Sequence, residues 1–454
     1  MAGRVAEAVM EQEIKNEMKQ RILAELDMSQ EIDDMEVRRL VDQCIMEYKG
    51  TIELPLPARI KLRKELFNTV RRMDVLSEFL EDESVTEIMI NGYDNIFIER
   101  SGRVYKVDQT FENEERLASI IQQIVAGCNR IVNEAVPIVD ARLADGSRVN
   151  VVLPPISLNG PTMTIRKFPK EKMTMERLIE VGALSEDAAE FLKRLVKARY
   201  NIFVSGGTGA GKTTFLNALS DYIPQQERVI TIEDSAELQL KNVVNLVRLE
   251  SRNSNVEGTN AVTIRELIKS SLRMRPDRVI VGEVRDAAAI DMLAAMNTGH
   301  DGSLSTGHAN SSGDMITRLE SMVLMGMELP LEAVRRQIAS AVDVIIHLGR
   351  LRDGSRKVLE IAEVTGIREG LVELHTIYEF EEMVAGEEQE VTDMVYAAAG
   401  TLSEQNVTDG FQLQKVTGRL RARAELLHQE KFLRAGIAYK SVLCAEVRSE
   451  GAGV

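Results

Sequence analysis

The spacing of apolar positions changes along the chain and divides its first part into two segments. Residues 1–50 alternate apolar and charged positions at helical spacing, which predicts a helical N-terminal segment. Residues 51–170 mix a helical stripe with short runs separated by Gly-containing turns, a pattern that predicts a small α+β domain. Within this domain we expect strands at 85–91, 94–107, 141–155 and 162–168, and a helix at 117–132. A linker rich in lysine is expected at 167–174.

Beyond the linker, helical stripes alternate with short runs that are wholly apolar. This alternation predicts an α/β domain over 171–380, with a parallel sheet flanked by helices. Buried strands are expected at 202–204, 228–232 and 278–281, and antiparallel strands over 342–380. Residues 381–454 are predicted to form a variable C-terminal segment, in which 418–437 contains a terminal helix and a turn.

A glycine-rich turn follows the apolar run at 202–204 and carries the chain's clearest chemical signal. It fits the pattern G-x-x-x-x-G-K-[ST] between a strand and a helix, where backbone N–H groups surround an anion. We expect the turn to bind ATP, with Lys212 on the β- and γ-phosphates and the Thr213 hydroxyl on Mg²⁺. The expected nucleotide-binding residues are Gly207, Thr208, Gly209, Ala210, Gly211, Lys212, Thr213 and Thr214.

Carboxylates end the next two apolar runs. Glu233 and Asp234 follow the first, and Glu283 follows the second. The carboxyl ends of parallel strands face the ligand crevice, so Glu233 and Glu283 are candidates for Mg²⁺ ligation or general-base catalysis. Asp234 is alternatively the cap of a following helix. The sequence leaves open which of the two glutamates is the base.

Histidines and arginines supply further candidates. His300 and His308 each follow a glycine, and no cysteine or carboxylate set completes a metal site around them. We therefore expect a γ-phosphate sensor or a communication loop, and a purely structural role for these histidines is the alternative. Arg142, Arg148 and Arg166 lie on strands near the linker, where they either contact phosphates or form surface ion pairs.

Composition narrows the classes of protein that fit. The net charge is −15, tryptophan is absent and aromatics make up 4% of residues, which argues against binding nucleic acid. The three cysteines form no C-x-x-C pair, so neither a disulfide framework nor a zinc site is predicted. The charged N-terminus predicts no secretory signal, and we expect a cytoplasmic protein.

Four motifs together resemble those of the secretion and pilus ATPases, a RecA-like branch of the P-loop proteins. They are 206–214 (Walker A), 231–237 (the Asp box), 271–286 (Walker B) and 299–310 (the His box). Residues 273–310 and 351–357 look most like the CpaF type, which serves Tad (Flp) pili. The chain lacks the tetracysteine insertion of the general secretion and pilus-extension relatives.

The resemblance implies a homo-hexameric ATP hydrolase, peripheral at the inner membrane, that acts on a platform protein of a pilus or secretion system. It implies a PAS-like fold for 51–170 and a nucleotide between that domain and the RecA-like one. It also implies catalytic roles for Glu283, Glu233, His308 and the three arginines. The alternatives are a type IV secretion traffic ATPase, a nucleic-acid translocase, and an ATP-binding switch without turnover.

Overall fold

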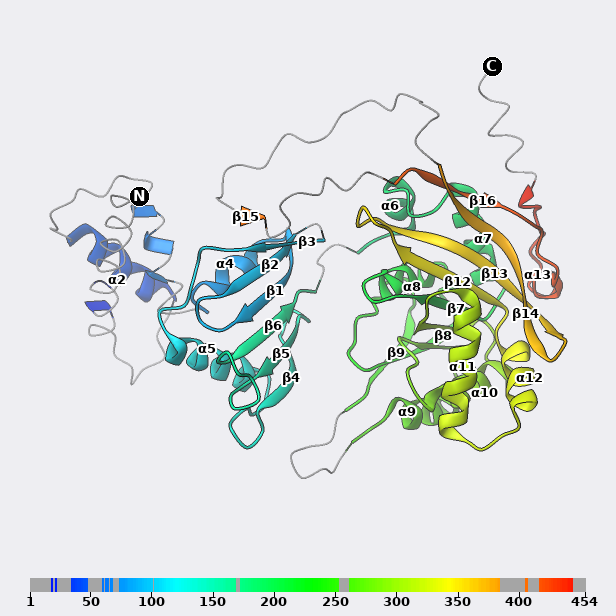
Figure 1. Ribbon diagram of the computed structural model, residues 1–454, viewed down its shortest axis with the longest axis horizontal. Helices are drawn as coiled ribbons and strands as arrows, with labels where there is room; N and C mark the ends of the chain where they lie inside the picture. Colours follow the sequence, from blue (N-terminus) through cyan, green and yellow to red (C-terminus); the bar gives the residue numbers. More distant parts are fainter. Residues whose placement is uncertain are drawn as a thin grey trace, which may run out of the picture. The chain divides into compact units, whose positions relative to one another are not determined.

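The fold is described by a computed structural model in which the chain divides into two compact units (Figure 1). Unit 1 comprises Met1–Lys170 and Ala398–Gly410, and unit 2 comprises Glu171–Ala397 and Phe411–Val454. The described residues are 18, 21–22, 34–47, 59–60, 62–64, 66–67, 73–100, 102–168, 172–252, 261–383, 405–406 and 416–443. Most of the predicted N-terminal and C-terminal segments, and the centre of the predicted linker, lie outside them.

Among its described residues, unit 1 is built on a seven-stranded antiparallel sheet with the order β15-β3-β2-β1-β6-β5-β4. The strands are β1 (Val85–Asn91), β2 (Ile96–Arg100), β3 (Arg103–Lys106), β4 (Ile138–Arg142), β5 (Arg148–Val152), β6 (Thr162–Arg166) and β15 (Gln405–Asn406). One strand was expected over 141–155, but the chain turns within that range. The Asp145 carboxylate accepts a hydrogen bond from the backbone N–H of Ser147 at 2.9 Å, and this turn separates β4 from β5.

Helices α4 (Leu76–Glu81) and α5 (Glu114–Gly127) contribute to the core of unit 1. Helix α5 begins earlier and ends earlier than the apolar stripe predicts. Asn113 caps it, since its side-chain oxygen accepts a hydrogen bond from the N–H of Arg116 at 2.8 Å. Asn129, whose φ is 54°, turns the backbone out of the helix just after its end. Helix α2 (Asp34–Glu47) belongs to a separate small cluster with Ile22 and Phe67.

Unit 2 contains, in the part of it that is described, a nine-stranded mixed sheet with the order β16-β14-β13-β12-β7-β11-β10-β8-β9. Its strands are β7 (Ile202–Gly206), β8 (Arg228–Glu233), β9 (Asn245–Glu250), β10 (Arg278–Val281), β11 (Leu304–His308), β12 (Val344–Arg350), β13 (Arg356–Arg368), β14 (Leu371–Glu382) and β16 (Gly418–Ala422). The pairs from β12 through β9 are parallel, and those from β12 to β16 are antiparallel.

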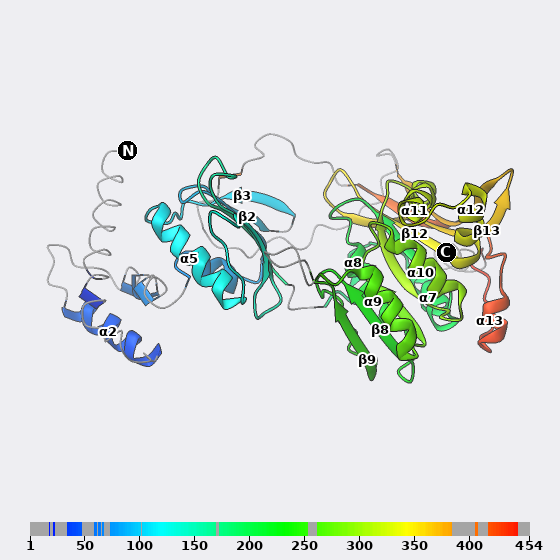
Figure 2. The ribbon, with the colours of Figure 1, turned by 90° about the horizontal axis from the view of Figure 1, so that it is seen from below.

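Helices cover both faces of this sheet. Ile202 and Val204 of β7 enter one core cluster and Phe203, between them, enters another, because successive side chains of a strand point to opposite faces. The first cluster is shared with α6 (Met175–Glu180), α7 (Glu186–Lys197), α8 (Lys212–Ser220) and α13 (Glu430–Arg434). The second is shared with α9 (Ile264–Ser271), α10 (Ala288–Asn297), α11 (Ser312–Gly326) and α12 (Leu331–Ala341); α9 and α10 lie side by side (Figure 2). The predicted α/β class is confirmed.

The region predicted to hold a terminal helix differs from expectation. Residues 418–422 form strand β16, antiparallel to β14, and only the short α13 is helical. Leu420 and Ala422 are buried and their neighbours face outward, so the local period is two rather than 3.6. Phe432 of α13 packs against Tyr200 with ring centroids 5.3 Å apart. This part of the chain therefore completes the sheet of unit 2.

Within the described stretches of the chain, no helix has both the length and the apolar composition that crossing a bilayer would require.

Candidate active site

The candidate site of unit 2 lies where the parallel strands of its sheet end. The phosphate loop follows β7, Glu233 ends β8, Glu283 follows β10 and His308 ends β11. These strands are neighbours in the sheet, so their carboxyl ends share one edge. The sheet thus gathers side chains that lie far apart in the sequence.

The phosphate loop has the conformation that its sequence predicts. Gly211 takes a left-handed φ of 91° at the N-cap of α8, a conformation that glycine adopts without strain. The helix then starts at Lys212, so its first N–H groups point toward the loop. Of the residues expected to bind the nucleotide, Gly207, Thr208 and Thr214 are exposed, Ala210 and Lys212 are buried, and Gly209, Gly211 and Thr213 are intermediate. A phosphate has access to this loop and to the positive end of α8.

Lys212 is buried under the loop. Its Nζ donates hydrogen bonds to the carbonyl oxygens of Gly206 at 3.1 Å and Gly207 at 3.0 Å. It also lies 3.3 Å from Nδ1 of His308. Lysine has no acceptor, so Nδ1 accepts and the imidazole proton sits on Nε2. The ammonium group therefore bridges the phosphate loop and the end of β11.

His308 extends this contact to a carboxylate. Its Nε2 lies 2.9 Å from Oε1 of Glu283, which accepts no well-aligned hydrogen bond from the described residues. Arg285 Nη2 donates to the other Glu283 oxygen at 2.7 Å. Lys212, His308, Glu283 and Arg285 form a continuous line of polar contacts, which we call the Lys–His–Glu line.

Burial and neighbouring charge set the protonation states along this line. Burial lowers the pKa of His308, and the nearby Lys212 ammonium lowers it further. Burial raises the pKa of Glu283, but the hydrogen bond and charge of Arg285, with the charge of Lys212, outweigh that and leave it below its ordinary value. At neutral pH the imidazole is therefore neutral and the carboxylate ionised.

Glu233 is in a different environment from Glu283. It is 3% exposed, and its Oε1 accepts hydrogen bonds from the N–H groups of Glu237 at 2.8 Å and Leu238 at 2.9 Å. Its Oε2 is buried and has no hydrogen-bond partner among the described residues. Burial raises the pKa of Glu233 to about 7, despite the opposing effect of the two backbone hydrogen bonds. The two glutamates are thus one buried acid poised near neutrality and one ionised, partly accessible carboxylate.

Gly282 explains how Glu233 fits against the neighbouring strand. A Cβ at this position would lie 2.9 Å from Cγ of Glu233, so a larger residue would displace that side chain. The backbone N–H of Gly282 donates a hydrogen bond to the carbonyl oxygen of Ile232 at 2.8 Å. The carbonyl oxygen of Gly282 accepts one from the Thr306 hydroxyl at 2.7 Å. These bonds fix the turn that presents Glu283.

The alternative left open for Asp234 is wrong, and the two histidines of the His box lie apart. Asp234 does not cap a helix, because residues 234–241 are not helical; its carboxylate accepts a hydrogen bond from the Ser251 hydroxyl at 3.0 Å. His300 and His308 do not converge on one site. His300 precedes β11 and lies 3.2 Å from the carbonyl oxygen of Ala295, whereas His308 ends that strand.

Unit 1 brings the three candidate arginines together. Arg142 is opposite Arg148, Arg148 is opposite Arg166, and Arg166 is opposite Glu87, in one row across four strands. The alternating buried positions, such as Val149, point into the core, so this arginine row lies on the other face of the sheet. Like charges directly opposite one another are destabilising in a sheet, so the row is a candidate site for an anion.

His347 is a residue that the sequence did not single out. It lies on β12, is 7% exposed, and has Nδ1 2.9 Å from the hydroxyl of Ser205, the residue before the phosphate loop. Burial lowers its pKa, and a backbone hydrogen bond connects it to Asn310. It therefore links the start of the phosphate loop to the His box. Its position next to β7 depends on strand order, which the sequence pattern does not reveal.

The residues at the sheet edge fit the needs of a magnesium nucleotide. No cluster of three or more His, Cys, Asp or Glu side chains in the described ranges is arranged to hold a metal ion. Mg²⁺ usually takes one or two protein ligands and completes its shell with phosphates and water. Thr213, on the first turn of α8, the buried Glu233 and the partly accessible Glu283 are suited to that role.

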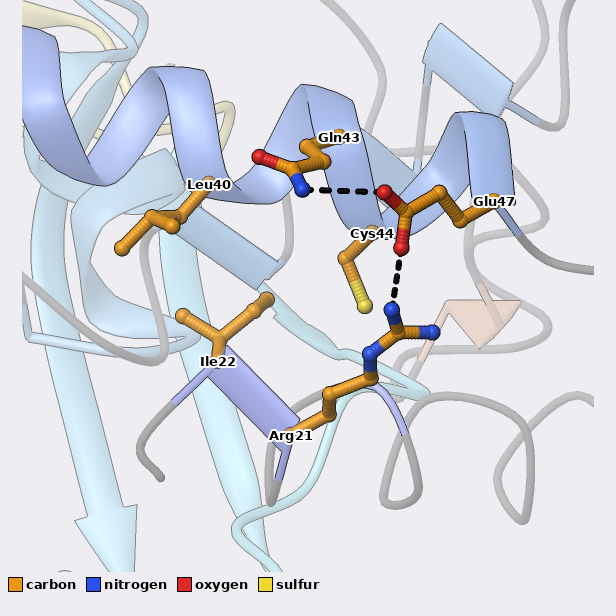
Figure 3. A pocket seen from close by; sticks show the side chains of 6 residues that line it. All are labelled: Arg21, Ile22, Leu40, Gln43, Cys44 and Glu47. Carbon is orange, nitrogen blue, oxygen red and sulfur yellow. Dashed lines mark hydrogen bonds and ion pairs between the residues drawn. The ribbon is translucent and has the colours of Figure 1, made fainter. Parts of the chain in front are cut away.

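A small pocket in unit 1 is unrelated to this chemistry. It lies between α2 and the segment around Ile22 and is lined by Arg21, Ile22, Leu40, Gln43, Cys44 and Glu47 (Figure 3). Arg21 pairs with Glu47, and Gln43 Nε2 donates to the same carboxylate at 2.9 Å. The polar groups of the pocket thus satisfy one another.

Comparisons with known proteins show which family the chain resembles. The family model described as "Type II/IV secretion system protein" matches residues 71–430. The chain is 34% identical over 331 residues to the protein Rv3659c of Mycobacterium tuberculosis, covering 72% of this chain and 93% of that protein. It is 33% identical over 299 residues to the conjugal transfer protein TrbB of Rhizobium radiobacter. This match covers 65% of this chain and 88% of TrbB.

Among solved structures, the VirB11 ATPase of the Brucella suis type IV secretion system, in complex with sulphate, is 31% identical to this chain. The match covers 63% of this chain and 92% of the VirB11 chain, with a TM-score of 0.36. The family model spans most of the chain and the relatives match it over nearly their whole length, so the chain belongs to the type II/IV secretion system protein family.

Proposed function

We propose that this chain is an ATP-hydrolysing secretion-system ATPase of the VirB11/TrbB type, serving type IV secretion or conjugal transfer. The observation that carries the proposal is the Lys–His–Glu line, which joins the phosphate-loop lysine to an ionised carboxylate at the sheet edge. Phosphoryl transfer needs positive charge on the phosphate and a group that orients the attacking water, and the two ends of this line supply them.

The named relatives favour this reading over a Tad (Flp) pilus motor. TrbB is named for conjugal transfer and VirB11 for type IV secretion, and the pilus type rests only on the resemblance of residues 273–310 and 351–357. The type IV secretion alternative therefore becomes the main proposal. A nucleic-acid translocase is the less favoured alternative, and a hydrolysis rate that added DNA or RNA leaves unchanged would reject it.

Each residue at the sheet edge has a proposed role. The loop N–H groups and Lys212 bind and neutralise the phosphates, and Glu283 orients the attacking water. When bound, the magnesium nucleotide supplies the scissile phosphoanhydride bond and a cation on its oxygens. His308 contacts both Lys212 and Glu283, so it couples the positions of these two side chains. Glu233 keeps the 237–238 backbone in place and takes up a proton near neutral pH.

The arginine row of unit 1 is proposed to contribute to ATP hydrolysis as well. Three arginines at paired positions of neighbouring strands carry bidentate donors of the kind that phosphate oxygens accept. We propose that Arg142, Arg148 and Arg166 stabilise phosphate charge during hydrolysis.

The proposed assembly is a homo-hexamer that works at the inner membrane on components of a secretion system. Light scattering of the purified chain, with and without Mg²⁺ and a non-hydrolysable ATP analogue, tests it together with phosphate release from ATP. Nucleotide-dependent hexamers and turnover would support the proposal. A chain that binds the analogue but never releases phosphate would contradict the hydrolase, and turnover by a strict monomer would contradict the ring.

A further inference from the structure

The outer side of the phosphate loop is held by a side chain to which the proposed reaction gives no role. Arg356, the first residue of β13, donates a hydrogen bond from Nε to the carbonyl oxygen of Gly209 at 2.8 Å. Its Cδ would lie 3.5 Å from a Cβ at Gly211, so the side chain also packs along the loop. Arg356 thus reaches from a different strand onto the backbone that surrounds the phosphate.

The hairpin that presents Arg356 is firmly anchored. Leu351 donates from its backbone N–H to the carbonyl oxygen of Ser355 at 2.8 Å, closing the turn between β12 and β13. The Asp353 carboxylate accepts from the Ser355 N–H at 2.9 Å and from the Val416 N–H at 2.8 Å. Strand β12 itself pairs with β7, with Leu348 opposite Gly206. The guanidinium therefore projects from a base fixed to the loop's own strand.

Arg356 differs from Lys212 in what a nucleotide would do to its contacts. Lys212 holds the carbonyls of Gly206 and Gly207 from beneath the loop, and the arrival of phosphates would draw its ammonium away from them. The Gly209 carbonyl is bonded from the hairpin side, and that bond competes with no phosphate. Arg356 remains a tether of the loop in both states.

We propose that Arg356 is a positioning residue that keeps the phosphate loop in its anion-binding form when Lys212 turns to the nucleotide. This inference rests on the proposed nucleotide site and adds a residue to it. A glycine-rich loop has much conformational freedom to lose on binding, and a tether that orders it beforehand lowers that cost. The contact is the same in the ground and transition states, so its loss should raise KM and leave kcat nearly unchanged.

The test compares variants of the full chain by binding of a fluorescent ATP analogue and by steady-state hydrolysis. Arg356→Ala removes the hydrogen bond and the packing, Arg356→Met keeps the packing alone, and Arg356→Lys keeps a cationic donor. Arg352→Ala is the matched control, since it removes the same charge from the same hairpin, where Arg352 pairs with Glu382 on the surface. Arg356 is exposed, so folding should persist, and thermal unfolding checks this.

We expect Arg356→Ala and Arg356→Met to raise Kd and KM about tenfold, which corresponds to about 1.4 kcal/mol. Arg356→Lys should recover most of the affinity, and Arg352→Ala should bind as the unmodified chain does. Equal affinity of Arg356→Ala and the unmodified chain, or an equal loss in Arg352→Ala, would overturn the inference. If the unmodified chain binds the analogue without turnover, the hydrolase proposal fails, while the binding comparison still decides the role of Arg356.

Discussion

Replacing Glu233 by glutamine should change how the stability of unit 2 depends on pH. The glutamine keeps an oxygen that accepts from the N–H groups of Glu237 and Leu238, as Oε1 does now. It cannot ionise, so it removes the cost of placing a charge on the buried Oε2. The perturbation is therefore confined to the titration of one carboxyl group.

The magnitude follows from the pKa of Glu233, which burial raises from an ordinary 4.5 to about 7. The folded chain keeps this proton over a range in which the unfolded chain has already lost it. The group's contribution to stability is complete below pH 4.5 and is lost as the pH rises through 7. At ~1.36 kcal/mol per pKa unit, the full loss is about 3 kcal/mol. Since Glu233 is only 3% exposed, little of this is screened by water.

Thermal unfolding between pH 5 and pH 8 measures the effect. The unmodified chain should lose about 2–3 kcal/mol more over this range than Glu233→Gln does, a difference of roughly 5–10 °C in Tm for a domain of this size. Glu328→Gln, which removes an exposed carboxylate of unit 2, is the control and should follow the unmodified chain. Parallel pH profiles for the unmodified chain and Glu233→Gln would refute the reasoning.

Three predictions concern hydrolysis. Lys212→Ala should leave less than a few per cent of turnover, because the developing phosphate charge loses its cation; substantial phosphate release would contradict the loop assignment. Glu283→Gln should bind the analogue normally and lower kcat ~100–1,000-fold, and an unchanged kcat would remove Glu283 from the mechanism. Arg166→Ala should lower kcat more than it weakens binding, whereas Arg103→Ala, an exposed arginine of the same sheet, should do neither; a loss of affinity alone would point to ground-state binding.

Much of unit 2 was predictable because its signals are local. The run at 202–204 is buried in β7, and the turn after it has the geometry that its glycines and lysine require. The class of the fold followed from the alternation of helical and wholly apolar segments. Strand order did not follow, because pairing depends on contacts between distant residues. For that reason the sequence named Lys212, His308 and Glu283 but did not show that they touch.

The features that the sequence did not predict also have a physical explanation. The role of His347 depends on a contact across the sheet, with Ser205, that leaves no periodic signal in the sequence. The glycine at 282 has its reason in the side chain of Glu233 on the neighbouring strand, which leaves no room for a Cβ. The 418–422 stretch is too short for a two-residue period to outweigh a helical reading. Tertiary packing, rather than local preference, decided each of these.

Strand β16 has a consequence for how the chain avoids self-association. Exposed strand edges are templates for pairing with other molecules, and charged side chains on a short outer strand discourage it. β16 shields the 378–382 end of the long strand β14, and it carries Arg419 and Arg421. Arg421 pairs with Glu381 at 3.0 Å, so the outermost strand is joined to its neighbour by charge as well as by backbone. A chain cut at residue 380 would lose this cover and leave backbone groups of β14 open to pairing with another chain.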